Sequence, residues 1–200
     1  MEIEFSKGKI VFDKELSDLD RFVLDFVDIL NKGKIKYVIV SGYVVLLFGR
    51  PRATEDVDIL TEHFDFNKFE ALVSLLKNSG FEIMNSPDVS ELYYEFLKKS
   101  TAIRIFRGNI YPNIELKFAH NDLNMEALKN PLKIIVNKQE FLISPLEQQI
   151  SYKLYLGSDK DVQDAKYLFQ LFKDKLDIGK IIQTNKLLKV ENKSKLYLGV

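Results

Sequence analysis

The sequence predicts an α+β fold: a mixed α/β core with a twisted mixed sheet and helices on one face, followed by a C-terminal helical part. Short apolar runs rich in β-branched residues, such as Tyr37–Val40, alternate with amphipathic helical patterns up to residue 143. From Ser144 onward only helical patterns occur, and no linker rich in Pro, Gly or Ser precedes them. We therefore expect a core over residues 1–143 and a helical subdomain over residues 144–200 that closes over its cleft.

The composition narrows the class of protein. The chain has 200 residues, of which 46% are hydrophobic, as in ordinary globular proteins. Its 29 Lys and Arg residues balance 29 Asp and Glu residues, so no global basic field favours non-specific nucleic-acid binding. Without cysteine it forms neither disulfides nor thiolate metal sites. The N-terminus does not resemble a signal peptide, and no apolar run has membrane-spanning length, so we expect a cytoplasmic protein with no membrane partner.

The first elements follow from hydrophobic spacing. An amphipathic helix is predicted over 16–30, where apolar residues recur at three- and four-residue steps, and Gly33 ends it. A buried strand follows over 37–40, and the pair Ser41-Gly42 breaks it. The apolar run 43–48 predicts a short buried helix, and the alternation over 55–60 predicts a half-buried strand.

Further strands and helices complete the predicted core. Gly80 closes the second amphipathic helix, which is predicted over 66–76. The capping-box pattern Ser144-Pro145-Leu146-Glu147 predicts the start of the first C-terminal helix. The remaining predicted elements are helices over 91–98, 160–173 and from 177, and strands over 81–84, 102–106, 113–118, 132–136 and 141–143.

Two aspartates on one strand are the first candidate site residues. Residues i and i+2 of a strand project from the same face with backbones roughly 6–7 Å apart, so Asp56 and Asp58 point together while Val57 faces the core. Convergent carboxylates suit Mg²⁺, which takes hard oxygen ligands. The alternative is a polar, solvated strand face.

A second candidate feature is the turn at Ser41-Gly42. It ends a buried strand and opens a helix, a geometry in which backbone N–H groups face an anion, and glycine lets a phosphate approach closely. Arg50 and Arg52 lie in the loop before the aspartates, where guanidinium groups are able to neutralise phosphate oxygens. The alternatives are a glycine needed only for a tight turn and a solvated basic loop.

Together these residues form a recognisable pattern. Gly42, the short helix and the run Arg52-x-Thr54-x-Asp56-Val57-Asp58 resemble the signature of the nucleotidyltransferase superfamily, the polymerase-β-like fold. This sequence motif is similar to that of minimal, stand-alone members of the superfamily, including the nucleotidyltransferase toxins of abortive-infection systems. One departure is Ser41, because the family usually has Gly-Gly or Gly-Ser at the turn.

The resemblance extends to two further regions. It implies a third carboxylate on a neighbouring strand, a place that Glu115 fits, although aspartate is commoner there. The segment from Leu142 to Phe169 is similar to a family segment in which a lysine faces the triphosphate and an acidic pair follows. Lys153, Asp161 and Asp164 occupy those positions. From the residues alone, Glu115 is equally an outward strand residue and Asp161 a helix-dipole partner.

The resemblance implies an enzyme that transfers a nucleoside monophosphate from an NTP, such as ATP, to a hydroxyl acceptor with Mg²⁺ or Mn²⁺. Asp56, Asp58 and Glu115 would be its catalytic metal ligands. The nucleotide-binding residues would be Ser41, Gly42, Arg52, Thr54, Lys153 and Asp164. For the acceptor we expect a tRNA end or a partner protein ahead of a small molecule. The alternative is a catalytically weak nucleotide-binding partner of a toxin–antitoxin pair, with an antitoxin as its partner.

Overall fold

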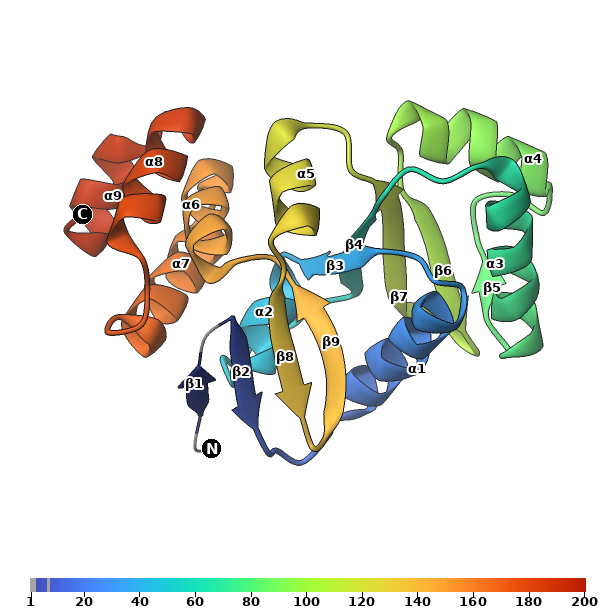
Figure 1. Ribbon diagram of the computed structural model, residues 1–200, viewed down its shortest axis with the longest axis horizontal. Coiled ribbons are helices and arrows are strands. Elements are labelled where there is room, and N and C mark those ends of the chain that lie inside the picture. Colours follow the sequence, from blue (N-terminus) through green and yellow to red (C-terminus); the bar gives the residue numbers. More distant parts are fainter. Residues whose placement is uncertain (1–2, 7) are drawn as a thin grey trace.

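The computed structural model describes residues 3–6 and 8–200, and it confirms the α+β fold class. The strands of this part of the chain form one mixed sheet in the order β1-β2-β8-β9-β3-β4-β7-β6-β5 (Figure 1). Their bounds are Glu4–Ser6 (β1), Lys9–Phe12 (β2), Tyr37–Val40 (β3), Asp56–Thr61 (β4), Glu82–Ile83 (β5), Ile103–Arg107 (β6), Asn109–Phe118 (β7), Leu132–Val136 (β8) and Gln139–Ile143 (β9).

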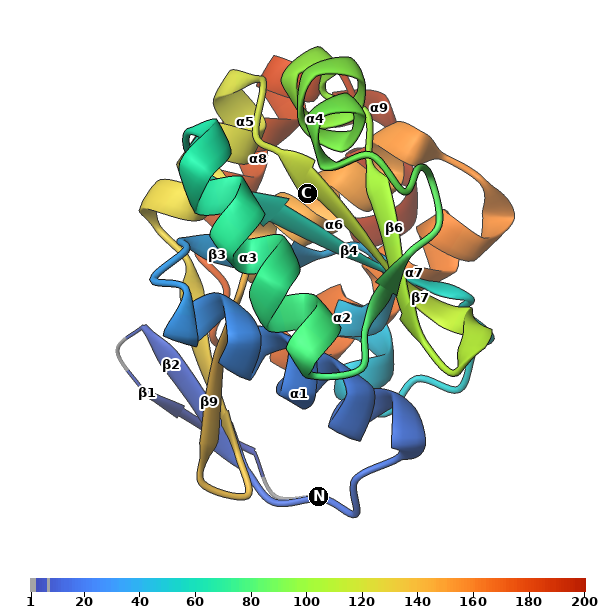
Figure 2. The same ribbon diagram turned by 90° about the vertical axis from the view of Figure 1, so that its right-hand side faces the viewer.

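The helices surround this sheet. Their bounds are Asp18–Lys32 (α1), Gly42–Leu47 (α2), Phe66–Asn78 (α3), Val89–Glu91 (α4), Asp122–Lys129 (α5), Leu146–Leu156 (α6), Asp159–Phe172 (α7), Ile178–Leu188 (α8) and Glu191–Leu198 (α9). A π-helical turn over Leu92–Phe96 and a 3₁₀ turn over Leu97–Lys99 extend α4. Helices α6–α9 gather at one end of the molecule and α3 and α4 at the other (Figure 1). Helices α1 and α3 lie side by side in front of the sheet (Figure 2).

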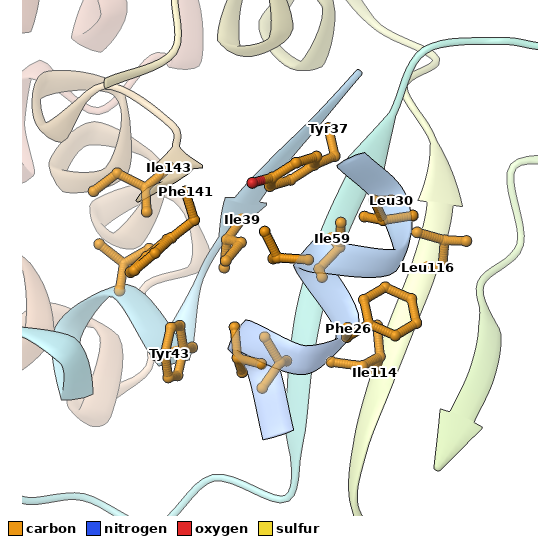
Figure 3. Close-up of a cluster of buried hydrophobic side chains, with 14 of the residues drawn as sticks. Phe26, Leu30, Tyr37, Ile39, Tyr43, Ile59, Ile114, Leu116, Phe141 and Ile143 are labelled. Atoms are coloured by element: carbon orange, nitrogen blue, oxygen red, sulfur yellow. The ribbon is translucent and has the colours of Figure 1, made fainter. Parts of the chain in front are cut away.

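The main core lies between the sheet and helices α1, α2 and α3. Alternate strand residues, among them Ile39, Ile59 and Ile114, point into it and are completely buried. The apolar stripe of α1 faces them with Phe26 and Leu30, as Figure 3 shows. Residues of α6 and α7 join the same cluster, so the C-terminal helices share one hydrophobic core with the sheet.

The opposite face of the sheet carries α5, which the sequence analysis did not predict. Val38 and Leu60 alternate with the residues of the main core and pack with Ala127 of α5 in a separate small cluster. The expectation of helices on one face only was therefore wrong. Because alternate strand residues share a face, Asp56 and Asp58 lie on the α5 side.

Other predicted elements differ in detail. The capping box at Ser144 does not form: Pro145 is the N-cap of α6 without a side-chain bond, and the Ser144 hydroxyl accepts from Gln149. Glu147 instead accepts a hydrogen bond from the backbone N–H of Asp177, at 2.9 Å. Strands β1 and β2 were not predicted, β7 begins earlier than predicted, and the tail forms two helices, α8 and α9. The division into two domains at residue 143 stays a prediction.

Candidate active site

Three acidic residues lie on the α5 side of two adjacent strands. Strand β4 pairs with β7 in parallel, and the register places Asp58 opposite Glu115 and Asp56 opposite Asn113. On its other side β4 pairs with β3, where Val40 lies opposite Asp58. Since Val40 is followed directly by Ser41, the turn and the carboxylate strand are neighbours, as the sequence predicts.

Two of the three carboxylates are bonded to cations from the sheet itself. The Lys117 ammonium donates to Asp58 at 3.0 Å, and the Arg104 guanidinium donates to Glu115 at 2.9 Å. Burial lowers the pKa of Lys117, but the nearby Asp58 carboxylate outweighs it and the net shift is upward, so Lys117 stays charged. Asp56 differs, because within the described residues its carboxylate accepts a hydrogen bond only from the Thr54 hydroxyl, at 3.4 Å.

The chemistry of this donor set fits a Mg²⁺ ion that arrives with a nucleotide. Asp56 and Asp58 offer hard oxygens from one strand face, and Mg²⁺ is commonly held by one or two carboxylates plus substrate phosphates. The side-chain oxygen of Asn113, opposite Asp56, is buried and has no hydrogen-bond partner in the described part of the chain. Across residues 3–6 and 8–200, no three Asp, Glu, His or Cys side chains gather as a ready metal cluster. As a third ligand, Glu115 stays a prediction that requires Arg104 to move.

The turn between β3 and α2 has an unusual backbone. Ser41 has φ of 66° and ψ of −132°, a region that non-glycine residues rarely enter and that costs about 1–3 kcal/mol. Its N–H donates to the side-chain oxygen of Gln149 on α6, at 3.2 Å. A Cβ added at Gly42 would lie 3.1 Å from the Arg52 guanidinium and 3.2 Å from the Thr54 hydroxyl. Glycine therefore leaves room for Arg52 and Thr54 to approach the turn closely.

A buried ion cluster lies behind this turn. Asp164 is completely buried and accepts hydrogen bonds from both Arg50 and Arg52. Lys153, whose side chain is 2% exposed, lies 3.0 Å from Asp164 and 2.8 Å from Asp161. Burial by itself raises the pKa of Asp161. Hydrogen bonds from Lys153 and Ser158 lower this pKa by more, so the net shift is downward. Three cationic side chains face two carboxylates, which leaves an excess of positive charge next to Gly42.

The predicted nucleotide-binding residues thus fall into two groups. Ser41 and Thr54 are partly exposed at the turn, and Gly42 is buried against the side chains of Arg52 and Thr54. Lys153 and Asp164 are buried in the ion cluster, and Arg52 connects the two groups, because it contacts Asp164 and lies beside Gly42. Because Asp164 is buried in the ion cluster, its surroundings do not support the predicted direct contact with a nucleotide.

The sequence analysis missed several polar residues of this region. Lys117 follows Glu115 by two positions on the same strand face, a spacing that would have revealed it. Gln149 and Asn113 carried no such signal, because only the packing of α6 and the register of β7 bring them to the site.

Comparisons with known proteins bear on the fold. No protein-family model and no curated protein sequence matches the chain. Among solved structures, an antigenic nucleotidyltransferase-like protein from Paracoccidioides brasiliensis is similar, with 20% identity, a TM-score of 0.55 and 91% of this chain and 92% of that chain covered. ANT(2")-Ia in complex with adenylyl-2"-tobramycin is also similar, with 10% identity, a TM-score of 0.56 and 86% and 98% of the two chains covered. The chain has the nucleotidyltransferase fold, which confirms the resemblance in the sequence.

No helix in the described part of the chain is both long enough and apolar enough to cross a membrane.

Proposed function

We propose that the protein transfers a nucleoside monophosphate from an NTP to a hydroxyl acceptor and releases pyrophosphate. The observation that carries this proposal is the placement of two convergent aspartates, Asp56 and Asp58, one strand away from the Ser41-Gly42 turn. A turn that accepts phosphates and a carboxylate pair that accepts Mg²⁺ are the two parts that such a transfer needs side by side. ATP is a candidate NTP, and Mn²⁺ is a candidate substitute for Mg²⁺.

The residues of the turn bind the leaving phosphates in this proposal. Gly42 lets the Arg52 guanidinium and the Thr54 hydroxyl lie against the turn, where they and Ser41 face the phosphates. Lys153 acts from behind, through the excess positive charge of the ion cluster, and Asp164 positions Arg52. Asp56 and Asp58 hold the metal, which stabilises the charge that develops on the reacting phosphate.

The acceptor oxygen attacks the α-phosphorus as the bond to the β-phosphate breaks. In-line displacement places the attacking oxygen opposite pyrophosphate. The hydroxyl proton leaves through a carboxylate of the site, for which Asp58 and Glu115 are the candidates. A tRNA end or a protein as acceptor stays a prediction, as do the antitoxin partner and the cytoplasmic location.

One observation favours the alternative, a nucleotide-binding protein with weak catalysis. Lys117 and Arg104 already neutralise Asp58 and Glu115, so a metal must compete with two internal cations. This alternative predicts that NTP binds without release of pyrophosphate, whereas the enzyme predicts both.

Asp58→Asn tests the proposal. Isothermal titration calorimetry should show that Mg-NTP binds the parent protein, and an α-phosphate-labelled NTP should yield labelled product and pyrophosphate. The variant should lose about 100-fold or more in turnover, because removing a key electrostatic group costs that much. Glu55→Gln is the matched control: it removes one charge from an exposed residue next to Asp56 and should leave turnover unchanged. Full turnover in Asp58→Asn would reject the proposal.

A further inference from the structure

A cavity of about 410 Å³ lies next to Asp58, on the face of the sheet that α5 covers. Its volume is within the range of about 300–1,000 Å³ that small-molecule sites occupy. Ser41 and Asp58 are among its lining residues, so it borders the proposed reacting centre. None of the steps proposed above uses the rest of its lining.

The cavity lies on the acceptor side of that centre. Along β4, Thr54 precedes the aspartates and Leu60 follows them. The phosphate-binding residues Gly42, Arg52 and Thr54 converge at the first end, and the cavity extends from Ser41 and Asp58 to Leu60 at the second. Because the attacking oxygen lies opposite the leaving pyrophosphate, a molecule bound in this cavity is on the correct side to attack.

The lining indicates an uncharged ligand. Its only carboxylate and its only ammonium among the described residues are Asp58 and Lys117, which lie 3.0 Å apart, and the metal that Asp58 would hold arrives with the negative charge of the nucleotide phosphates. A polycation would need unpaired carboxylates here, and a polynucleotide would need concentrated Lys and Arg. His120 adds a single imidazole at the exposed rim.

The same lining indicates hydroxyl groups next to an apolar surface. Leu60, Leu123 and Ala127 form an apolar wall, and the ring of Tyr152 lies on the α6 side. Gln148 donates to the carbonyl oxygen of Leu123, and its own side-chain oxygen is buried with no hydrogen-bond partner in the described structure. An unpaired buried acceptor costs about 1–3 kcal/mol, so a ligand that donates to it gains affinity.

We propose that this cavity binds the acceptor, and that the acceptor is a small, uncharged molecule with several hydroxyl groups and one apolar face. The inference rests on the proposed function. One hydroxyl oxygen of this molecule forms a bond to the α-phosphorus, the bond to the β-phosphate breaks, pyrophosphate leaves, and the hydroxyl proton passes to solvent through a carboxylate. Another hydroxyl donates to Gln148. This acceptor replaces the macromolecule that the sequence favoured.

Asn124→Trp tests the site. Asn124 lines the cavity from α5 and is partly exposed, so an indole there fills the cavity without entering the core. Met125→Trp is the matched control, because Met125 is 50% exposed on the same helix and does not line the cavity. Circular dichroism and thermal unfolding check that both variants fold. Two measurements follow: the affinity for Mg²⁺ with a non-hydrolysable ATP analogue, and transfer of label from α-labelled NTP.

The acceptor probes are fractions of a cell extract: the neutral, cationic and anionic parts of a low-molecular-mass ultrafiltrate, total RNA, and protein. We expect label in the neutral fraction, a loss of about 100-fold in that transfer for Asn124→Trp, and unchanged transfer for Met125→Trp. Affinity for the analogue should stay unchanged in both variants. Label in RNA, protein or a charged fraction, or no product at all, would overturn the inference. Loss of analogue binding in Asn124→Trp would assign the cavity to the nucleotide. Failure of the parent protein to bind the non-hydrolysable analogue of any of the four NTPs would reject the proposed function itself.

Discussion

Replacing Asp164 with asparagine should destabilise the protein by about 3–5 kcal/mol, the cost of removing one partner from a buried ion pair. Asp164 is completely buried, and the side chains of Arg52 and Lys153 are only 9% and 2% exposed. Asparagine preserves the size of the side chain but leaves Asp161 as the one carboxylate for three cations. For a chain of this size the loss corresponds to a fall of about 6–20 °C in the unfolding midpoint.

Equilibrium unfolding in urea measures this effect, and the slope of the transition should stay unchanged because the folded core stays the same. Asp159→Asn is the control: it lies in the first turn of the same helix but is exposed, so its loss should cost no more than about 1 kcal/mol. If Asp164→Asn cost no more than its control, the three cations would not depend on Asp164, and its role in positioning Arg52 would be refuted.

Two further changes test the turn, and a third tests Asp20 of α1, which accepts a hydrogen bond at 2.9 Å from the hydroxyl of Tyr43, the residue after Gly42. Gly42→Ala places a Cβ 3.1 Å from Arg52 and 3.2 Å from Thr54, so calorimetry should show about tenfold weaker NTP binding in a stably folded protein; unchanged affinity would show that these side chains give way freely. Ser41→Gly removes the strain of a φ of 66° and should raise the unfolding free energy by about 1 kcal/mol in urea titration; a decrease would mean that the serine side chain stabilises the turn. Burial raises the pKa of Asp20, but hydrogen bonds from its neighbours outweigh this effect and hold the pKa below its ordinary value of 3.8. The contribution of Asp20 to the free energy of unfolding is therefore present above that value and is lost as pH falls through the lowered pKa. Asp20→Asn should therefore reduce stability at pH 7 and flatten the acid limb of the stability–pH curve; a curve parallel to that of the parent would contradict this assignment.

The centre of the fold was predictable because its signals are local. Tyr37–Val40 is a largely buried apolar run, and polar and apolar residues alternate from Asp56 to Ile59, so each strand follows from a few neighbouring residues. The aspartate pair was predictable for the same reason, since a two-residue spacing on a strand fixes a shared face. The resemblance in sequence then supplied the order of these parts.

The missed features depend on contacts that are distant in sequence. Strand β2 pairs with β8, more than a hundred residues away, and its short apolar run has no strong period of its own. The predicted capping box at Ser144 does not form, because the Ser144 hydroxyl accepts a hydrogen bond from Gln149 and the Glu147 carboxylate accepts one from the backbone N–H of Asp177. The counter-cation of Glu115 appears only once the sheet register brings Arg104 opposite it.

The buried ion cluster also says what the C-terminal helices contribute. A buried ion pair is often no more stabilising than apolar residues of the same volume, so stability alone does not account for Arg50, Arg52 and Asp164 in this place. The cluster ties the loop before β4 to α7, and Arg52 leaves it to lie against Gly42. The helices after residue 143 therefore orient the guanidinium that faces the turn, and the proposed phosphate site forms only when both parts of the chain are packed together. Separating residues 1–143 from 144–200 should accordingly abolish NTP binding, even if the sheet of the first part still folds.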